Sequence, residues 1–350
     1  MRLIFVTDTL SSGGAERVIS ILANYFSSKI TTEIICLRKM EAFYKIVPEV
    51  RVLYADDYAK LWLKKMLWLR NYVLQEDIVI PFMVKVYCVT LFSLIGKKIK
   101  VIATERNDPK TTGIPWKFLR LFLLPKVNAL VVQTQQIKDY FSETIQKKIK
   151  IILNPLDLNN CYQGEWDMDS KLVLAVGRTD RQKNYPMMIH AFKRVHDIHP
   201  EYKLEIWGNR NISEDGEKII ELINSLGVSD YITIRGRTDD MAGLYGKAYM
   251  FVMTSNYEGL SNALIEAICS GLPVISTKVS GATEVINNGE NGILVDVGNE
   301  KDFCQAMMYY IDKPREAKRM AKNARRGRAF FSKETICYQW EELIASVAKK

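Results

Sequence analysis

The sequence lacks closely spaced cysteine pairs. Its six cysteines are widely separated and form no C-x-x-C motif: Cys36, Cys88, Cys161, Cys269, Cys304 and Cys337. A disulfide framework or a cysteine-rich metal site depends on such spacing, so both are disfavoured. Isolated cysteines are typical of small core residues in a reducing compartment. We therefore expect a cytoplasmic protein.

Long apolar segments are also missing. The opening MRLIFVTDTL has too short an apolar part for a signal peptide and no small-residue cleavage site. No apolar run reaches the roughly 20 residues of a membrane-spanning helix. The sequence therefore predicts neither a secretory leader nor a helix that crosses a bilayer.

The net charge of +9 is unevenly distributed along the chain. Residues 1–165 contain 24 Lys and Arg against 15 Asp and Glu, whereas residues 166–350 contain 25 of each kind. The first half therefore carries the whole excess of positive charge. A basic half favours phosphate groups, acidic substrates or an anionic membrane surface as partners, and it does not by itself specify nucleic acid.

Two segments of the basic half combine lysine with tryptophan and leucine. Tyr58–Leu74 reads YAKLWLKKMLWLRNYVL, and Pro115–Lys126 reads PWKFLRLFLLPK. A basic amphipathic helix of this composition can lie in the headgroup region of a bilayer. The alternative is a buried helix whose lysines extend to solvent. Two such segments in one half favour the membrane surface.

Short apolar runs alternate with helical patterns along the whole chain, which is typical of an α/β fold with parallel sheets. In the first half we expect strands at Leu3–Thr7, Glu33–Leu37, Val50–Tyr54, Ile78–Ile80, Lys100–Thr104, Ala129–Val132 and Lys150–Leu153. The helices expected there are Gly14–Ser28, Leu61–Leu74, Met83–Ile95, Pro115–Leu124 and Gln135–Thr144. In the second half we expect strands at Leu172–Val176, Lys203–Trp207, Tyr231–Ile234, Tyr249–Met253, Pro273–Ser276 and Gly292–Val295. The helices expected there are Pro186–His196, Gly216–Leu226, Met241–Gly246, Leu260–Cys269, Ala282–Asn287 and Glu300–Asp312.

A polar, turn-rich segment at Asn154–Lys171 separates the two halves and predicts a linker. At about 150 residues per domain, a chain of this length predicts two domains. We place them at residues 1–160 and 171–328, with a helical tail that starts at Arg315 and ends in a helix over 329–350. Ligands of open α/β sheets bind at the carboxyl ends of the strands, so we expect a cleft between the two domains.

Two loops after predicted strands carry candidate anion-binding groups. In SSGGAER, Gly13 and Gly14 lie where a strand turns into a helix, an arrangement that binds anions through backbone N–H groups. The motif is neither G-x-G-x-x-G nor a Walker loop, so NAD or ATP is disfavoured, and a tight turn that needs glycine is the alternative. In GRTDRQKN, Arg178 and Lys183 follow the first strand of the second half, where both can reach a diphosphate. Solvated surface cations are the alternative.

The strongest group of candidates lies in SNYEGLSNALIEAICSGLPVIST, residues 255–277. Glu258 follows a predicted strand, and Glu266 lies on the next predicted helix between apolar neighbours. A buried carboxylate is costly unless it is hydrogen-bonded. The hydroxyls of a sugar or a ribose are suitable partners for Glu266, whereas an exposed loop acid is the alternative for Glu258.

Together these motifs resemble those of the retaining glycosyltransferases of family GT4. The resemblance is carried by Glu258 and Glu266 in an E-x7-E spacing, by the GR…KN loop at 177–184, by GGAER, and by GATEVINNGENGILVD at 281–296. It implies the GT-B fold: two Rossmann-like α/β domains, with the acceptor in the first and a nucleotide-sugar donor in the second. It also implies a C-terminal helix that crosses back to the first domain.

The resemblance further implies roles for individual residues. Arg178 and Lys183 would hold the donor diphosphate, Glu258 would contact sugar hydroxyls, and Glu266 would contact the ribose. The remaining donor contacts would come from Gly14, Gly259, Leu260, Ser261 and, within the loop Arg235–Arg237, Arg237. Because fixed cations stabilise a departing nucleoside diphosphate, we expect no metal ion or other cofactor.

The sequence departs from the family at one position. Many members carry a histidine near the reacting sugar, but the corresponding segment here reads ATERNDP and places Arg106 there. All three histidines lie in the second half: His190, His196 and His199. Arg106 stays charged, so it is a candidate for binding a phosphate rather than a general base. Glu105 and Asp108 are then candidate acid/base or orienting groups, and a merely polar loop is the alternative.

The predicted function is retaining transfer of a hexose-type sugar, or its N-acetylhexosamine, from a nucleotide sugar to a lipid-linked or saccharide acceptor in polysaccharide biosynthesis. Family habit favours UDP as the nucleotide. The enzyme would act in the cytoplasm as a peripheral protein at the inner face of the cell membrane, without nucleic acid. The alternatives are a nucleotide-sugar epimerase or hydrolase of the same fold and a non-catalytic subunit that binds sugar nucleotides.

Overall fold

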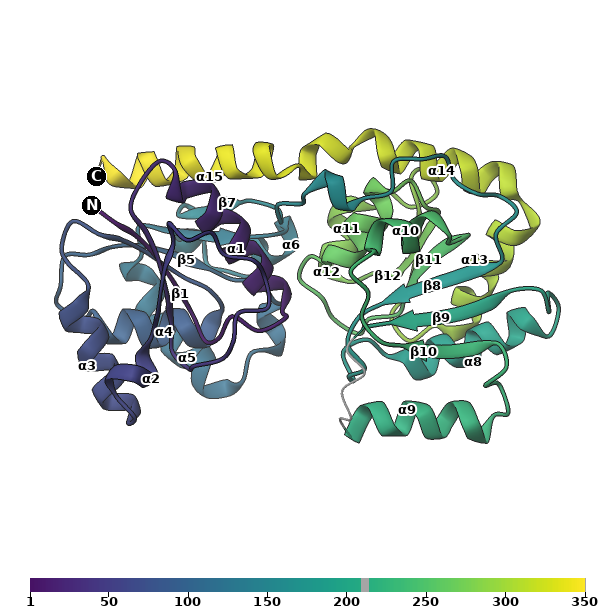
Figure 1. The fold of residues 1–350 in the computed structure, drawn as a ribbon, viewed down its shortest axis with the longest axis horizontal. Helices are drawn as coiled ribbons and strands as arrows, with labels where there is room; N and C mark the ends of the chain where they lie inside the picture. Colours follow the sequence, from purple (N-terminus) through teal and green to yellow (C-terminus); the bar gives the residue numbers. More distant parts are fainter. Residues whose placement is uncertain (209–213, 350) are drawn as a thin grey trace. The chain divides into compact units, whose positions relative to one another are not determined.

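The protein is described by a computed structural model over residues 1–208 and 214–349. The chain forms two compact units, one of Met1–Pro155 with Lys333–Lys350 and the other of Leu156–Ser332. We refer to them as the N-terminal unit and the C-terminal unit. Each is a parallel sheet with helices on both faces, as Figure 1 shows. The predicted α/β class, with two Rossmann-like sheets, is confirmed.

Among the described residues, the sheet of the N-terminal unit has seven strands in the order β3-β2-β1-β4-β5-β6-β7. They are β1 (Leu3–Thr7), β2 (Thr32–Cys36), β3 (Arg51–Tyr54), β4 (Ile78–Pro81), β5 (Lys100–Thr104), β6 (Ala129–Val132) and β7 (Ile149–Ile151). Each neighbouring pair is parallel. The strand order reverses between β1 and β4, and open α/β sheets bind ligands outside the carboxyl ends of strands at such a point.

Two layers of helices cover this sheet. One face packs against α1 (Gly14–Ser27) and α15 (Lys333–Ala348). The other face packs against five helices: α3 (Trp62–Tyr72), α4 (Val84–Ser93), α5 (Ile114–Leu123), α6 (Gln135–Asp139) and α7 (Glu143–Gln146). A short helix, α2 (Ala55–Tyr58), precedes α3. In α1 the buried apolar residues recur at helical spacing, which turns one side of the helix to the sheet: Val18, Ile19, Leu22, Ala23 and Phe26.

The sheet of the C-terminal unit has six strands within the described residues, in the order β10-β9-β8-β11-β12-β13. They are β8 (Leu172–Val176), β9 (Lys203–Trp207), β10 (Ile232–Arg235), β11 (Met250–Met253), β12 (Val274–Thr277) and β13 (Ile293–Val295). The strands again pair in parallel. Their carboxyl ends therefore lie at one edge of the sheet, where the loops that carry the candidate donor residues begin.

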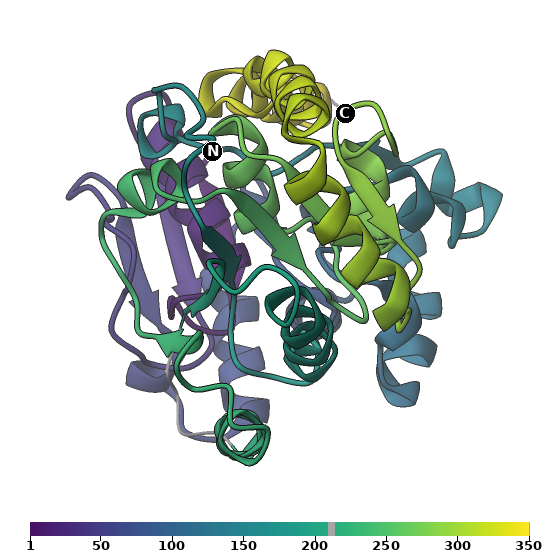
Figure 2. The same cartoon turned by 90° about the vertical axis from the view of Figure 1, so that its right-hand side faces the viewer.

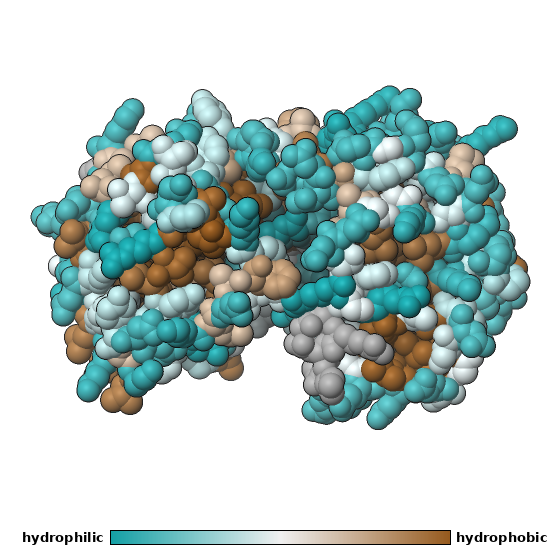
Figure 3. Space-filling view, in the orientation of Figure 1, coloured by the Kyte–Doolittle hydropathy of each residue, from teal (hydrophilic) through white to brown (hydrophobic). Residues whose placement is uncertain are grey.

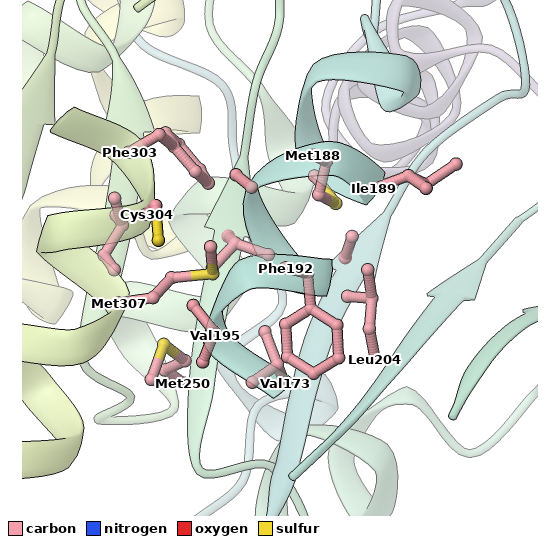
Figure 4. Packing of buried hydrophobic residues seen from close by; sticks show 14 of the residues in the cluster. Val173, Met188, Ile189, Phe192, Val195, Leu204, Met250, Phe303, Cys304 and Met307 are labelled. Atoms are coloured by element: carbon pink, nitrogen blue, oxygen red, sulfur yellow. The ribbon is translucent and has the colours of Figure 1, made fainter. Parts of the chain in front are cut away.

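The main core of the C-terminal unit lies under α8 (Tyr185–His196) and α13 (Glu300–Asp312), which pack side by side on one face of the sheet (Figures 1 and 2). Figure 4 shows Phe192 and Val195 of α8 pointing toward Val173 of β8 and Leu204 of β9. On the same face lies α9 (Glu214–Ser225). On the opposite face lie α10 (Met241–Gly246), α11 (Asn262–Cys269) and α12 (Ser280–Val285).

The segment predicted as a linker packs onto the C-terminal unit from Leu156 onward. The side chain of Cys161 is buried, and Trp166 donates a hydrogen bond from Nε1 to the carbonyl oxygen of Tyr249 at 2.7 Å. The boundary between the two units falls after Pro155, inside the predicted linker.

Two predicted helices are wrong in their extent. The tail expected to continue from Arg315 is two helices, α14 (Pro314–Arg326) and α15, because the chain turns at Gly327 and the carbonyl of Phe331 accepts a hydrogen bond from the amide of Leu156. The helix expected over Gln135–Thr144 is broken into α6 and α7, because Ser142 is extended with ψ 154°. Among the described residues, no helix has the length and apolar character needed to cross a membrane.

Trp340 tests how strongly α15 is held to the N-terminal unit. Its side chain is 0% exposed, and its ring stacks on Phe82 with centroids 6.3 Å apart. We expect Trp340→Ala to lower the free energy of unfolding by about 3–5 kcal/mol, because it leaves a cavity in the core. Tyr338→Ala, on the same helix but 57% exposed, is the matched control and should change it by about 0.5 kcal/mol or less. Equal losses in urea unfolding would contradict this assignment.

Candidate functional site

The clearest contact between predicted site residues is an ion pair in the C-terminal unit. Lys183 follows β8 and Glu258 follows β11, and Lys183 Nζ donates to Glu258 Oε1. The two side chains are only 12% and 11% exposed. Gln182 donates from Nε2 to the other carboxylate oxygen of Glu258 at 2.7 Å. The structure therefore brings together two residues that lie 75 positions apart in the sequence.

The two loops that carry this pair are joined by hydrogen bonds from the β11 loop to backbone carbonyl oxygens of the β8 loop. Thr254 donates from Oγ1 to the carbonyl oxygens of Lys183 and Asn184, at 2.9 and 3.1 Å. The amide of Asn256 donates to the carbonyl of Gln182 at 2.8 Å. Asn184 adopts a left-handed conformation with φ 50°, which asparagine tolerates better than most residues. These bonds fix Lys183 and Glu258 on a common framework.

Gly177 leaves room for the side chain of Lys183. A Cβ atom at Gly177 would lie 2.8 Å from Lys183 Cε and 2.9 Å from Tyr185 Oη. Real Cβ contacts are not this short, so any larger residue would displace the lysine. Arg178, the next residue, is 67% exposed on its side-chain atoms and pairs with Asp180 at 3.1 Å. The structure thus places one predicted cation inside the site and the other at its surface.

The backbone at Gly259, Leu260 and Ser261 is fixed by α12. A Cβ atom at Gly281 would lie 1.7 Å from the carbonyl oxygen of Gly259, so only glycine permits this approach. Ser261 caps α11, because its side chain accepts from the amide of Leu264. The segment predicted to meet sugar or phosphate therefore ends at the amino end of a helix, where the helix dipole favours negative charge.

Glu266 lies on α11 and is 4% exposed, in agreement with its apolar neighbours in the sequence. Tyr245 of α10 donates its hydroxyl hydrogen to Glu266 Oε2 at 2.8 Å. This hydrogen bond offsets part of the cost of burying the carboxylate. Sequence reasoning missed Tyr245, since nothing in the sequence indicates that these two helices meet.

Two arginines, Arg235 at the end of β10 and Arg237 in the loop after it, have different surroundings. Arg235 donates from Nη2 and Nε to Glu205 Oε1 at 2.9 and 3.2 Å, and Trp207 donates from Nε1 to Glu205 Oε2 at 2.7 Å. Glu205 thus neutralises Arg235 at this edge of the sheet. Arg237, the predicted donor contact, is exposed. Sequence reasoning also missed Glu205, which occupies an inconspicuous position in the middle of β9.

Gly14 begins α1 in the N-terminal unit, where an anion-binding turn is predicted. A Cβ atom at the preceding Gly13 would lie 2.0 Å from Glu16 Oε2. The carboxylate of Glu16 therefore folds over the amino end of its own helix. An acid there is favoured by the helix dipole, so an external anion at this turn would have to displace it.

Arg106 lies below the surface of the N-terminal unit, with 6% of the residue exposed. It donates from Nη1 to Asn154 Oδ1 at 2.6 Å, and its guanidinium lies 4.9 Å from the ring centroid of Phe82 and 6.0 Å from that of Trp340. Within the described residues, Nε and Nη2 have no hydrogen-bond partner. Burial lowers the pKa of Arg106 to about 9. The surrounding side chains would have to move before Arg106 touched a phosphate.

Glu105 and Asp108, the candidate acid/base groups, have different environments. Glu105 is 1% exposed, accepts from the hydroxyl of Tyr87 at 3.0 Å and pairs with Arg120 of α5 at 3.5 Å. Burial raises the pKa of Glu105 to about 7. Asp108 accepts from the amide of Lys110 at 2.9 Å and caps a short helical turn. The structure favours a structural role for Glu105, since its carboxylate faces the core.

The raised pKa of Glu105 predicts a specific dependence of stability on pH. The folded protein holds this proton more tightly than the unfolded chain, whose glutamates titrate near 4.5. The stabilising contribution of this proton is therefore complete below pH 4.5 and is lost as the pH rises toward 7. We expect the free energy of unfolding of the wild type, relative to Glu105→Gln, to fall over this range.

Glu105→Gln should also be less stable overall, because it leaves Arg120 buried without a carboxylate. The decisive measurement is therefore how the difference in free energy of unfolding between wild type and Glu105→Gln, measured by urea unfolding, changes with pH. Glu143→Gln, an exposed change on α7, controls for the loss of one carboxylate. A constant difference between wild type and Glu105→Gln from pH 4.5 to 7 would refute the assignment.

Comparison with known proteins identifies a family for the C-terminal part of the chain. Residues 162–327 match the family described as "Glycosyl transferases group 1". The chain is 28% identical over 362 residues to the GalNAc-alpha-(1->4)-GalNAc-alpha-(1->3)-diNAcBac-PP-undecaprenol alpha-1,4-N-acetyl-D-galactosaminyltransferase of Campylobacter jejuni, covering 99% of each chain. It is also 28% identical to the N-acetylgalactosamine-N,N'-diacetylbacillosaminyl-diphospho-undecaprenol 4-alpha-N-acetylgalactosaminyltransferase of the same organism, over 92% of this chain and 93% of that one.

Solved structures agree on the fold. The Anabaena protein HepE, in a complex with UDP and glucose, superposes with a TM-score of 0.83 at 16% identity, over 99% of this chain and 100% of that one. Sucrose-phosphate synthase from Thermosynechococcus elongatus superposes with a TM-score of 0.85 at 18% identity, over 99% and 98%. The family predicted from the motifs is therefore confirmed. Residues 162–327 belong to the group 1 glycosyltransferases (GT4), and the chain as a whole has the GT-B fold.

Proposed function

We propose that the protein transfers a hexose or N-acetylhexosamine from a UDP-sugar, with retention at the anomeric carbon, to a saccharide carried on a polyprenyl diphosphate. Two full-length relatives are named for transfer of N-acetylgalactosamine to undecaprenol-linked saccharides. A superposable structure holds UDP-glucose. The observation in this chain that carries the proposal is the contact between Lys183 and Glu258 at the carboxyl ends of β8 and β11.

In this proposal Lys183 and Glu258 serve as charge partners for each other until the donor binds. Lys183 neutralises Glu258 in the protein without donor, so neither charge is left unpaired in a nearly buried place. A bound UDP-sugar supplies new partners for both, the diphosphate for Lys183 and sugar hydroxyls for Glu258. Gln182 keeps the carboxylate oriented through its own hydrogen bond during this exchange.

The same residues stabilise the leaving group. Breaking the anomeric C–O bond leaves an oxocarbenium-like sugar and places negative charge on the diphosphate. The ammonium of Lys183 and the exposed guanidinium of Arg178 lie at the strand ends where that charge would develop. Positioned cations of this kind act without reorganisation at the moment of reaction, which is why they lower the barrier.

The N-terminal unit would receive the acceptor. A polyprenyl diphosphate carries two phosphates next to a membrane-embedded tail, and the excess positive charge of residues 1–165 suits both features. We therefore propose that the enzyme works at the cytoplasmic face of the membrane, in contact with anionic headgroups. Arg106 is buried in this unit, and two of its donor groups, Nε and Nη2, have no partner among the described residues. After local rearrangement, an acceptor phosphate would accept hydrogen bonds from both.

A screen of nucleotide sugars by thermal unfolding tests the donor. A ligand that binds only the folded state raises its stability, by about 2.7 kcal/mol at a concentration 100 times Kd. We expect UDP-sugars to raise the unfolding temperature and the matching GDP- and ADP-sugars to leave it unchanged. No shift with any nucleotide sugar would contradict the proposed function at its first step.

Lys183→Ala tests the leaving-group role. We expect a loss of about 100-fold or more in kcat for transfer from the UDP-sugar found in the screen, because the variant lacks a positioned cation in the transition state. Lys193→Ala, which changes a half-buried lysine on α8 that pairs with Asp197 outside the site, is the control and should retain wild-type activity. Undiminished transfer by Lys183→Ala would overturn the site assignment while leaving the enzyme class intact.

A further inference from the structure

Helix α5 carries large apolar side chains on the side that faces solvent, although its other side already packs on the core. Inward, Arg120 and Leu123 are 3% and 2% exposed. Outward, four large apolar side chains are 62–73% exposed: Ile114, Phe118, Leu121 and Phe122. These positions are spaced by four, seven and eight residues, so they form one continuous row along the helix. We call this row the α5 stripe.

The neighbouring helix extends the apolar surface. Phe92 lies on α4 and Ile95 follows its end, and they are 50% and 42% exposed. Helices α4 and α5 pack against each other on the same face of the sheet. Separately from the α5 stripe, Figure 3 shows hydrophobic residues at the surface along the edge of the N-terminal unit where Figure 1 labels α2 and α3. Proteins that stay in water rarely expose contiguous apolar surface of this kind without a partner.

The segment that contains α4 and α5 is strongly basic. Residues 78–138 contain ten Lys and Arg and only two acidic residues, Glu105 and Asp108. Glu105 is buried against Arg120, and Asp108 caps a turn through the amide of Lys110. Within the described part of the chain, the ammonium groups of the lysines next to α4 and α5 make no ion pair: Lys85, Lys110, Lys117 and Lys126. An apolar row with a rim of unpaired lysines is complementary to an anionic bilayer surface.

The other segment with a membrane-like composition is less suited to this partner. In α3 the ammonium of Lys65 is buried and pairs with Asp56 at 2.6 Å, and Lys39 pairs with Asp57 beside it. Arg70 donates to the carbonyl oxygens of Ser93 and Ile95, so its charge is used inside the unit. Helix α3 does expose leucines, among them Leu63 at 67% and Leu67 at 52%. Its cations, however, are partly consumed by internal contacts and by acidic neighbours.

We propose that the α5 stripe, with Phe92 and Ile95, is the surface by which the N-terminal unit docks on a bilayer that contains anionic phospholipid. The apolar side chains enter the boundary between headgroups and acyl chains, and the lysines at the rim meet lipid phosphates. This inference rests on the proposed function only for the expectation that the acceptor lies in a membrane. The proposed contact consists of the exposed apolar residues of α5 and of the end of α4.

The docking helix is tied to the strand end that carries Arg106. Arg120, on the inward side of α5, pairs with Glu105 at 3.5 Å, and Glu105 immediately precedes Arg106. A second contact from the same guanidinium goes to the hydroxyl of Tyr140 at 3.0 Å. A membrane held by the outward side of α5 therefore lies at a fixed distance from the loop after β5.

Flotation with vesicles tests this surface without donor or acceptor. We expect the full-length protein to float with vesicles of phosphatidylcholine and phosphatidylglycerol and to remain behind with phosphatidylcholine alone. The double variant Phe118→Ser/Phe122→Ser should lose at least about tenfold in partitioning, because each phenyl ring contributes apolar area to the contact. Phe330→Ser, a 70% exposed change in the C-terminal unit, is the matched control and should float like the wild type.

Three results would overturn the proposal. One is undiminished flotation of the Phe118→Ser/Phe122→Ser variant, including the case in which Leu63→Ser/Leu67→Ser on α3 abolishes it instead. Another is equal binding of the wild type to neutral vesicles. The third is a vesicle-free wild type that sediments as a dimer while the α5 variant is monomeric, because a second copy would then cover the stripe.

Further measurements separate this test from the proposed reaction. Equal thermal unfolding of the wild type and the α5 variant shows that the exposed substitutions leave the fold intact. Transfer to a short-chain, water-soluble acceptor should be unchanged in the α5 variant and lost in Lys183→Ala. Normal flotation with no transfer to any acceptor would leave the docking surface standing and reject the proposed function. A loss of transfer to the soluble acceptor in the α5 variant would overturn a purely docking role.

Discussion

The ion pair between Lys183 and Glu258 depends on the parallel sheet of the C-terminal unit, and the candidate donor site depends on the ion pair. Parallel strands end at one edge, so loops far apart in sequence start side by side. Thr254 and Asn256 then connect one loop to the other by hydrogen bonds. Gly177 has no side chain, which leaves space for the side chain of Lys183 to pass over it. A nearly buried pair with fixed surroundings can exchange partners with a ligand without rebuilding the loops.

The N-terminal unit uses its arginines differently. Arg106 and Arg120 lie on opposite sides of the sheet, Arg106 against Phe82 and Trp340 and Arg120 against Glu105. Both are buried, but only Arg120 has a carboxylate partner. A guanidinium without one is tolerated when aromatic faces lie beside it, as they do around Arg106. Arg106 is therefore held by packing from α15 as well as by Asn154.

Sequence patterns were sufficient where a local signal determines the structure. The strands Lys100–Thr104 and Leu172–Val176 are predicted to the residue, because a short apolar run that contains β-branched residues and lies between polar loops is typical of a buried strand. The contact between Lys183 and Glu258 was not predicted, because it depends on β8 and β11 being neighbours in the sheet. The burial of Arg106 and the hydrogen bond from Tyr245 to Glu266 were not predictable, because each depends on a partner distant in the sequence. The end of α14 at Gly327 does have a local signal, since glycine commonly follows the last residue of a helix, and it was missed.

The net positive charge of the first half overstates the charge that a ligand can reach. Several of its cations are consumed inside the fold, as Arg2 is by Asp77, Lys65 by Asp56 and Arg120 by Glu105. These pairs contribute to folding and offer nothing to a ligand. The charge available outside is what remains, and around α5 it consists of lysines beside a row of exposed apolar side chains. Attraction by unpaired lysines falls with salt, whereas burial of the phenylalanines does not, so the two together hold a surface more firmly than either alone.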